Sequence, residues 1–339
     1  MSYNVAIVGA TGAVGKKLIS TLLDRDFPIK NLYLLASKKS EGKEIILGDK
    51  KYVVTSVEKF DFFKADIAFF SAGASVSAKF AIEAEKKNCY VVDNTSYFRM
   101  QNDIALIVPE INAHELNFTN RKIIANPNCS TIQMLMALKP IHDINKITKI
   151  IVSTYQSASG AGQQAMEELT MQSKDILNKN LIKIEKFPKQ IAFNVIPQID
   201  VFEDNGCTKE EMKMVNETKK ILDDKIEVNA TCVRVPSYIG HAESIYIELE
   251  KDMKLINLTK ELNIFSGVVF SDTDYHTPID SSGNDWVYIS RVRKDLNKQN
   301  AFNLWVVSDN LLKGAALNSV QIGEVLIKKE KVTNDEKKQ

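Results

Sequence analysis

One stretch decides the fold of this chain: Val5-Ala6-Ile7-Val8-Gly9-Ala10-Thr11-Gly12-Ala13-Val14-Gly15. Its first four residues form a continuous apolar run, which is typical of a strand buried on both faces of a sheet. The small residues that follow predict a tight turn, and residues 13–23 have the pattern of a helix. At such a turn the backbone can approach a pyrophosphate, whose charge the helix N-terminus stabilises. Because the glycine spacing is one residue looser than the common fingerprint, a turn without a ligand stays open as an alternative.

Short apolar runs and helical patterns continue to alternate through the first half of the chain. Strands are expected over residues 32–36, 52–54, 67–70 and 89–92, and a helix is expected over residues 76–86. Continuous apolar strands separated by helices predict a parallel sheet that is covered on both faces. The N-terminal part is therefore expected to have an α/β fold of the Rossmann type.

After Cys129 the pattern changes to longer strands in which apolar and polar residues alternate. These strands are expected over residues 147–156, 191–197, 227–235, 242–249, 287–293 and 302–308. Their alternation predicts a mostly antiparallel sheet in an α+β domain. Residues 315–327 return to a helical period. A chain of 339 residues is long enough for two domains with separate cores.

The composition is that of an ordinary globular protein. Hydrophobic residues make up 44% of the chain and charged residues 26%, and 44 basic residues balance 43 acidic ones. This balance creates no field that would attract nucleic acid or an anionic membrane. No apolar run approaches the length of a membrane span, and the N-terminus opens into a strand instead of a signal peptide. The four cysteines are far apart and lack metal-ligand spacing, so we expect a cytoplasmic protein with reduced thiols and no metal.

The end of the second strand indicates which nicotinamide cofactor would bind. An NAD-selective site usually places an acidic residue there, to bind the ribose diol. Here the strand is followed by Ser37-Lys38-Lys39-Ser40, and the first acid is Glu41. Hydroxyl and ammonium groups suit a 2′-phosphate, so NADP(H) is expected in preference to NAD(H). A solvated pair of lysines is the alternative.

Cys129 lies in Asn126-Pro127-Asn128-Cys129-Ser130-Thr131, directly ahead of a helical run that is expected to stop at Pro140. A cysteine at a helix N-terminus feels the positive end of the helix dipole and unpaired N–H groups, which favour the thiolate. Asn128 is expected to be the N-cap of this helix. Cys129 is therefore a candidate nucleophile, and a buried structural cysteine is the alternative.

Four further side chains lie where expected strands end. Gln156 precedes a flexible segment of small residues, and Arg234 and His241 flank a strand and turn. Arg99 follows the fifth strand, at the carboxyl edge where parallel sheets bind ligands. Each also has a structural interpretation, because arginines are normally surface residues and a histidine can satisfy a turn. Catalysis would need these side chains together, as a base and as cations beside a thiolate.

Glu210 and Lys213 are three residues apart in a helix expected over residues 209–222. This spacing places both side chains on one helix face. A solvated ion pair on the surface is the simpler interpretation of such a spacing. A role in binding a charged substrate is the functional alternative.

These residues occur in an order that resembles the aspartate-semialdehyde dehydrogenase family along nearly the whole chain. The seven-residue step from Arg234 to His241 matches as well. The matching stretches are residues 8–15, residues 70–73, residues 92–96 with Arg99-Met100, residues 126–131, Gln156 with residues 159–162, residues 210–213, residues 234–236 with 240–241, and residues 305–310.

The resemblance implies an N-terminal NADP-binding domain over residues 1–127, completed by a C-terminal helix over residues 314–339. It implies a central catalytic and dimerisation domain over residues 128–313. The implied reaction is the reversible, NADPH-dependent reductive dephosphorylation of L-aspartyl-4-phosphate to L-aspartate-4-semialdehyde and phosphate, in lysine, threonine and methionine biosynthesis. A homodimer is expected, with pairing into a tetramer left open, and no nucleic-acid or membrane partner is expected.

The resemblance also implies a role for each matching residue. Cys129 would be the nucleophile, His241 the general acid/base, and Gln156 would orient the acyl intermediate. Arg234 would hold the α-carboxylate and Glu210 the amino group of the substrate. Residues implied to hold phosphate are Arg99 and Lys213, with Asn128. Residues implied to bind the cofactor are Gly9, Thr11, Gly12, Ala13, Val14, Ser37, Lys39, Ser40, Ser71, Ala72, Gly73, Ser159, Gly160 and Asn310.

Two positions depart from the family pattern, because Leu312 and Lys39 stand where relatives often carry arginine. The nearest rival is N-acetylglutamyl-phosphate reductase, which shares the cysteine chemistry. Its motif is typically Pro-Gly-Cys, and its substrate has no free ammonium group for Glu210. Glyceraldehyde-phosphate dehydrogenase differs in its nucleophile motif and sugar-phosphate pocket. A non-catalytic NADP-binding sensor would not require Cys129 and His241 together.

Overall fold

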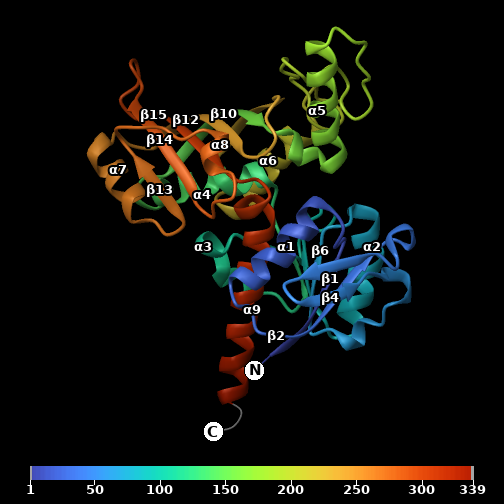
Figure 1. The fold of residues 1–339 in the computed structure, drawn as a ribbon. Coiled ribbons are helices and arrows are strands. Elements are labelled where there is room, and N and C mark those ends of the chain that lie inside the picture. Colours follow the sequence, from blue (N-terminus) through green and yellow to red (C-terminus); the bar gives the residue numbers. More distant parts are fainter. Residues whose placement is uncertain (1, 337–339) are drawn as a thin grey trace. The chain divides into compact units, whose positions relative to one another are not determined.

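The computed structural model describes residues 2–336, with side chains as far as Lys329, and it contains two compact units (Figure 1). The first unit consists of residues up to Pro127 together with residues from Ala315 onward. The second unit consists of residues 128–314. Each unit has its own sheet and its own buried core.

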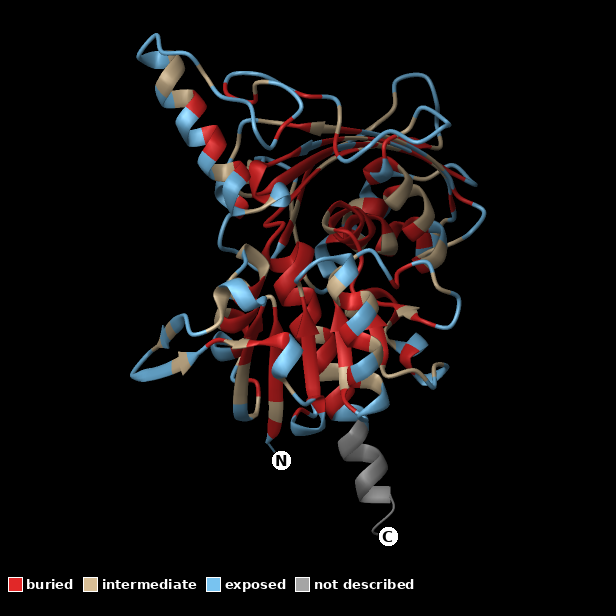
Figure 2. Cartoon of the chain, turned by 90° about the vertical axis from the view of Figure 1, so that its right-hand side faces the viewer, coloured by how far each residue is buried: buried red, intermediate tan, exposed pale blue. Residues whose placement is uncertain are grey.

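The first unit is built on a sheet in which seven strands are described, in the order β5-β2-β1-β6-β7-β9-β8. All neighbouring strands in it run parallel, as the apolar runs predicted. Figure 2 shows the central strands as buried. The strands are β1 (Tyr3–Val8), β2 (Ile29–Ala36), β5 (Thr55–Ser56), β6 (Ile67–Phe70), β7 (Tyr90–Asp93), β8 (Ala105–Leu106) and β9 (Ile123–Ala125).

The strand expected over residues 52–54 is not part of this sheet. Instead, β3 (Glu44–Leu47) and β4 (Lys50–Val53) form a separate antiparallel hairpin. Gly48 has a φ of +56° in its two-residue turn, a conformation that suits glycine. The residues of β4 are exposed or half-buried, so the apolar residues of this strand do not belong to a central strand of a sheet.

Helices follow the strands in the first unit, and the C-terminal helix completes the core. Ala316, Val320 and Leu326 belong to the same buried cluster as Val5 and Leu18. An ion pair of 2.7 Å between the Arg25 Nε and a Glu324 oxygen joins α1 to α9. The helices are α1 (Ala13–Asp24), α2 (Ala74–Lys86), α3 (Pro109–Asn112) and α9 (Leu317–Glu336).

The second unit has a sheet with six described strands, in the order β11-β10-β12-β15-β14-β13. The inner pairings are antiparallel, but β11 runs parallel to β10 and β13 runs parallel to β14. The sheet is therefore mixed, which corrects the expectation of a mostly antiparallel sheet. The strands are β10 (Ile147–Gln156), β11 (Glu227–Arg234), β12 (His241–Leu249), β13 (Val268–Ser271), β14 (Val287–Lys294) and β15 (Ala301–Ser308).

The strand expected over residues 191–197 does not form. The backbone N–H groups of Ile191 and Ala192 donate to the side-chain oxygen of Gln172, at 2.9 and 3.2 Å. Phe193 then adopts a φ of +58°, which breaks an extended strand. An isolated bridge between Ile196 and Arg234 is the pairing found there. The side chain of Gln172 thus accepts hydrogen bonds from two backbone N–H groups that would otherwise pair with a neighbouring strand.

The expectation that Pro140 ends the first helix of this unit is also wrong, since α4 runs from Cys129 to Ile144. Proline removes one helical hydrogen bond. Residues 130–138 are all buried, however, so tertiary packing holds the helix through that defect. The other helices of the unit are α5 (Gln163–Leu177), α6 (Lys209–Ile221), α7 (Leu255–Ile264) and α8 (Pro278–Ser281). In the residues described, none of the helices is long and apolar enough to cross a membrane.

Candidate active site and nucleotide-binding loop

The glycine-rich turn lies where strands β1 and β6 end, at the point where the strand order of the parallel sheet reverses. Gly9 has a φ of +94°, and a side chain there would come within 2.9 Å of Ser71. A side chain on Gly15 would lie 2.1 Å from the Gly9 carbonyl oxygen. The turn and the segment after β6 therefore touch at the position where ligands of parallel sheets bind.

The residues of this turn fit a pyrophosphate. Helix α1 begins at Ala13 with Gly12 as its N-cap, and no side chain caps its first N–H groups. Those groups and the positive end of the helix dipole suit an anion. Gly9 and Ala10 donate to the carbonyl oxygen of Leu35 in β2, which brings the turn beside the end of that strand.

The other residues of this unit that were predicted to bind the cofactor also follow parallel strands. Ser37 caps a short 3₁₀ helix (Lys38–Ser40) directly after β2. Gly73 has a φ of +99° and is the N-cap of α2, again without a capping side chain. Arg99, in the same unit, is buried, and its guanidinium donates to the carbonyl oxygens of Asn94 and Asn126 at 2.8 and 2.9 Å.

Cys129 is the first residue of α4, and Asn128 is its N-cap, as the sequence predicted. The Asn128 side-chain oxygen accepts from the backbone N–H groups of Ser130 and Thr131, at 3.0 and 3.3 Å. Its backbone N–H donates to the Glu217 carboxylate at 2.6 Å. Asn128 is therefore fixed through both its backbone and its side chain, and it fixes the start of the helix that carries the thiol.

Glu210 is a buried, ionised carboxylate beside this helix start. One of its oxygens accepts from the side-chain amides of Asn128 and Gln156, at 2.9 and 3.1 Å. The other accepts from Lys213 at 3.0 Å. Burial raises the pKa of Glu210, but Lys213 and these amide donors outweigh it and bring the pKa to about 2. Glu210 and Lys213 thus form a partly buried pair instead of a solvated one.

Gln156 has a defined orientation. Thr154 donates its hydroxyl to the Gln156 side-chain oxygen at 2.9 Å, and the Gln156 nitrogen donates to Glu210. This arrangement assigns the oxygen and nitrogen ends of the amide by their partners. Thr154 and Gln156 are both buried.

His241 is fully buried, and its tautomer follows from one hydrogen bond. Its Nδ1 accepts from the backbone N–H of Ser157 at 3.1 Å, so the neutral ring carries its proton on Nε2. That Nε2 has no hydrogen-bond partner among the residues described. Burial, and then the charge of Arg234, lower the pKa of His241 to about 3. The ring is therefore a neutral hydrogen-bond donor near neutral pH.

Arg234 lies beside His241 at the end of β11. Its Nη1 donates to the Ser157 carbonyl oxygen at 2.7 Å, and the side chain is buried. Gly160 borders both residues, because a side chain there would come within 2.8 Å of the Arg234 Nη1 and 3.3 Å of the His241 Nε2. Burial lowers the pKa of Arg234, and the nearby Glu210 opposes that shift.

Two protein families of semialdehyde dehydrogenase domains match this chain. The NAD binding domain matches residues 4–118, and the dimerisation domain matches residues 138–313. The aspartate-semialdehyde dehydrogenase of Shewanella sp. (strain DB6705) is 50% identical over 331 residues, covering 96% of this chain and 98% of that protein. The chain belongs to the aspartate-semialdehyde dehydrogenase family.

Other relatives agree with this assignment. Aspartate-semialdehyde dehydrogenase from Bacillus subtilis (strain 168) is 50% identical over 341 residues, covering 96% of this chain and 97% of the relative. The crystal structure of aspartate semialdehyde dehydrogenase II from Vibrio cholerae complexed with ASA has a TM-score of 0.95 and 49% identity. It covers 97% of this chain and 99% of that one.

Asn310 and Ser157 form a hydrogen-bonded group beside His241 in this member of the aspartate-semialdehyde dehydrogenase family. Asn310, expected at the cofactor, accepts from Ser157, Ser159 and the backbone of Gly240 at 2.9–3.2 Å. Ser157, which was not expected at all, contacts the imidazole of His241 and the guanidinium of Arg234. Its only sequence signal was its position directly after Gln156, at the end of β10.

Gly314 also proves to be a site residue. A side chain there would lie 2.8 Å from the Cys129 Cβ and 3.3 Å from its Cα. Since both atoms are at the start of α4, a larger residue would displace Cys129, the candidate nucleophile. Leu312, the departure from the aspartate-semialdehyde dehydrogenase pattern, is buried, and its N–H donates to Asp309.

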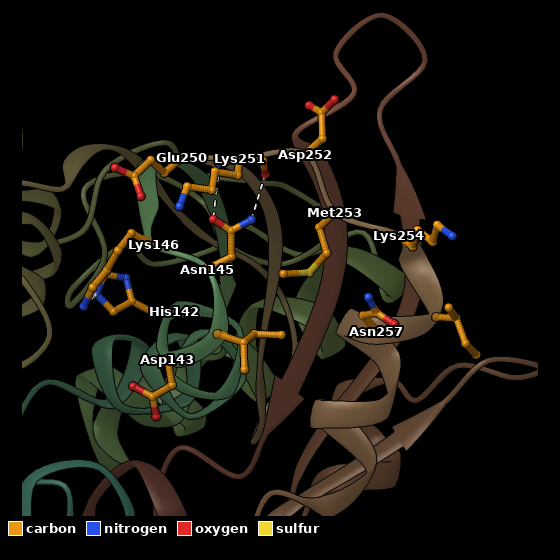
Figure 3. Close-up of a pocket in the computed structure, with 12 residues that line it drawn as sticks. His142, Asp143, Asn145, Lys146, Glu250, Lys251, Asp252, Met253, Lys254 and Asn257 are labelled. Atoms are coloured by element: carbon orange, nitrogen blue, oxygen red, sulfur yellow. Dashed lines mark hydrogen bonds between the residues drawn. The ribbon is translucent and has the colours of Figure 1, made fainter.

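A separate cavity of about 660 Å³ lies at the other end of α4 (Figure 3). It is lined by His142 and Lys146, and Asn145 bridges to the backbone of Lys251 there. A helix rises about 1.5 Å per residue, which places this cavity on the order of 20 Å from Cys129. The cavity is thus no part of the site around Cys129.

In the described part of the chain, no group of three or more histidine, cysteine, aspartate or glutamate residues is arranged to hold a metal ion.

Proposed function

We propose that this chain catalyses the reversible, NADPH-dependent reductive dephosphorylation of L-aspartyl-4-phosphate to L-aspartate-4-semialdehyde and phosphate. One observation carries this proposal. Cys129 begins a helix that is capped by Asn128, and the side chain of Asn128 donates a hydrogen bond to the buried carboxylate of Glu210. The thiol thus has an activating helix N-terminus and a neighbouring anion that can receive a substrate ammonium group. The full-length similarity to named aspartate-semialdehyde dehydrogenases supports the same reaction.

The substrate would be held at the two charged groups of its amino-acid end, the α-carboxylate and the ammonium group. The planar guanidinium of Arg234 uses Nη1 for Ser157, and its remaining N–H groups suit the α-carboxylate in a two-point contact. Glu210 is ionised near neutral pH, so it can bind the ammonium group. This second contact favours an aspartyl substrate over an acetylated one, which has no ammonium group.

Catalysis would begin with attack of the Cys129 thiolate on the acyl carbon. The C–O bond to phosphate then breaks, which leaves a thioester on sulfur and releases phosphate toward Lys213 and Arg99. The Nε2–H of His241 can donate a hydrogen bond to the oxyanion of each tetrahedral state. Transfer of the proton itself to the oxygen or sulfur that becomes basic during collapse would require the protonated ring, since a neutral imidazole that lost its Nε2 proton would be left as an imidazolate. Gln156 would orient the acyl carbonyl, since its amide is already aligned by Thr154.

The cofactor would supply a hydride to the thioester carbon. Its pyrophosphate would lie on the N–H groups of residues 12–14, and its 2′-phosphate beside Ser37, Lys39 and Ser40. The segments Ser71-Ala72-Gly73 and Ser159-Gly160 would line its other parts. The dimerisation-domain match favours a homodimer. The cytoplasm is the proposed location.

A panel of aldehydes tests the reaction directly. Phosphate-dependent NADP reduction should proceed with aspartate semialdehyde, and at most weakly with acetylglutamate semialdehyde or glyceraldehyde phosphate. The expected preference is at least about 100-fold, because neither competitor can place an ammonium group at Glu210 together with an α-carboxylate at Arg234. An equal or faster rate with acetylglutamate semialdehyde would assign the chain to the rival reductase. Absence of turnover with all three aldehydes would favour the non-catalytic sensor.

Lys39→Gln should weaken the use of NADPH specifically. The residue follows β2, and it offers a positive charge for a 2′-phosphate. We expect the KM for NADPH to rise about five- to tenfold, with the KM for NADH unchanged, since NADH lacks that phosphate. Lys43→Gln, which removes the same charge a few residues further on, is the matched control. An equal loss with both cofactors would contradict this assignment, as would a strong preference of the unmodified enzyme for NAD.

A further inference from the structure

Lys213, the proposed phosphate ligand, is already paired with two carboxylates. Its ammonium nitrogen lies 3.0 Å from an oxygen of Glu210 and 3.0 Å from an oxygen of Asp200. Burial lowers the pKa of Lys213, but these two anions outweigh it and raise the pKa above its usual value. Lys213 is therefore charged, and the three groups together carry a net charge of minus one. A phosphate dianion that enters the site therefore meets three charged groups with a net negative charge, and not an unpaired ammonium group.

The two carboxylates have different surroundings. Glu210 is buried, and the amides of Asn128 and Gln156 stabilise its charge. The Asp200 side chain is 37% exposed, and the contacts described for it are Lys213 and the backbone N–H of Val201. Asp200 is thus the partner that stands on the solvent side of the ammonium group. It is the carboxylate that an anion from solution would have to compete with.

Asp200 is held in place by the backbone around it. Its φ is +70°, a left-handed conformation that aspartate and asparagine tolerate better than most residues. One carboxylate oxygen accepts from the Val201 N–H at 2.9 Å, and the Val201 carbonyl oxygen accepts from Lys209 at the start of α6. The carboxylate is therefore fixed relative to the helix that carries Lys213. A mobile surface charge would not have such a defined position.

We propose that Asp200 is a positioning residue that holds Lys213 and competes with phosphate for it, and so limits the affinity of the enzyme for phosphate. The inference rests on the proposed function, in which Lys213 binds the phosphate of the substrate. Weak binding would favour departure of phosphate after thioester formation. In the opposite direction, phosphate is a substrate, so the same competition would raise its KM.

The substitution Asp200→Asn tests the effect of the Asp200 charge alone. Asparagine adopts the same backbone conformation, and its oxygen can still accept from Lys213 or from Val201. With aspartate semialdehyde and NADP, we expect the KM for phosphate to fall about three- to tenfold, a range that allows for screening by solvent. The KM for aspartate semialdehyde should stay within about twofold, because Arg234 and Glu210 remain in place. High concentrations of potassium chloride should reduce the difference, since salt screens an exposed charge.

Asp204→Asn is the matched control, since it removes the same charge from the same segment without a described contact to Lys213. An unchanged or higher KM for phosphate in Asp200→Asn overturns the proposal. An equal fall in Asp204→Asn does so too, because it would show a general effect of charge. If the unmodified enzyme does not oxidise aspartate semialdehyde with phosphate at all, the proposed function fails and this inference fails with it. Normal turnover together with an unchanged KM for phosphate refutes the inference alone.

Discussion

Replacement of Cys129 by alanine is expected to abolish turnover, and replacement by serine is expected to leave at most a trace. The thiolate is the group that forms and releases the acyl intermediate, and alanine has no nucleophile. A serine hydroxyl is not ionised near neutral pH, so the helix N-terminus cannot make it an equivalent nucleophile. We expect kcat to fall by at least about 10⁴-fold in both variants, measured as phosphate-dependent NADP reduction.

Cys207→Ser is the matched control for the thiol. Cys207 is half-buried in a turn, and its described hydrogen bonds are made by its backbone N–H and carbonyl groups, so the change should leave turnover nearly unaltered. Circular dichroism should show that the Cys129 variants remain folded, because the cap of α4 is made by Asn128. Near-normal activity in either Cys129 variant would disprove the thioester mechanism.

Arg234→Lys is expected to lower kcat/KM for aspartate semialdehyde by about 10²- to 10³-fold. A lysine keeps the charge but has no planar fork, so it cannot contact both Ser157 and a carboxylate in the same geometry. Because Arg234 is buried, the substrate carboxylate would be left imperfectly paired in a site with little water. The loss should appear mainly in the KM for the aldehyde.

The KM for NADPH should change by less than about twofold in Arg234→Lys, since the residues proposed to hold the phosphates of the cofactor lie in the first unit. Arg293→Lys, at an exposed position of β14, provides the same substitution away from the site and should behave like the unmodified enzyme. A comparable loss of NADPH affinity in Arg234→Lys would show that Arg234 does not bind the substrate carboxylate.

The parts of the site that could be predicted depend on neighbours in sequence. The N-cap at Asn128 depends on donors two and three residues later, and the close approach of Gly15 to the Gly9 carbonyl oxygen joins positions six residues apart. Family resemblance supplied roles for more distant residues such as Arg234. Both kinds of prediction use patterns that are visible in the linear chain.

The parts that failed depend on contacts between distant segments. Ser157 fixes the tautomer of His241 across 84 positions, and no local pattern indicates that contact. Gln172 takes the N–H groups of residues 191 and 192, which turns an apolar run into a loop. Asp200 shows a third case, because its left-handed backbone and its bond to Lys213 follow from the tertiary fold.

The division of the first unit into two chain segments has a consequence for biosynthesis. The ribosome makes residues 128–314 before α9 (Leu317–Glu336) exists, so the second unit can assemble its core while synthesis continues. The nucleotide-binding unit must wait, because Ala316, Val320 and Leu326 complete the cluster that contains Val5 and Leu18. The segment before residue 128 is therefore made earlier than the second unit but completes its core later, and part of its apolar surface stays uncovered until α9 is made.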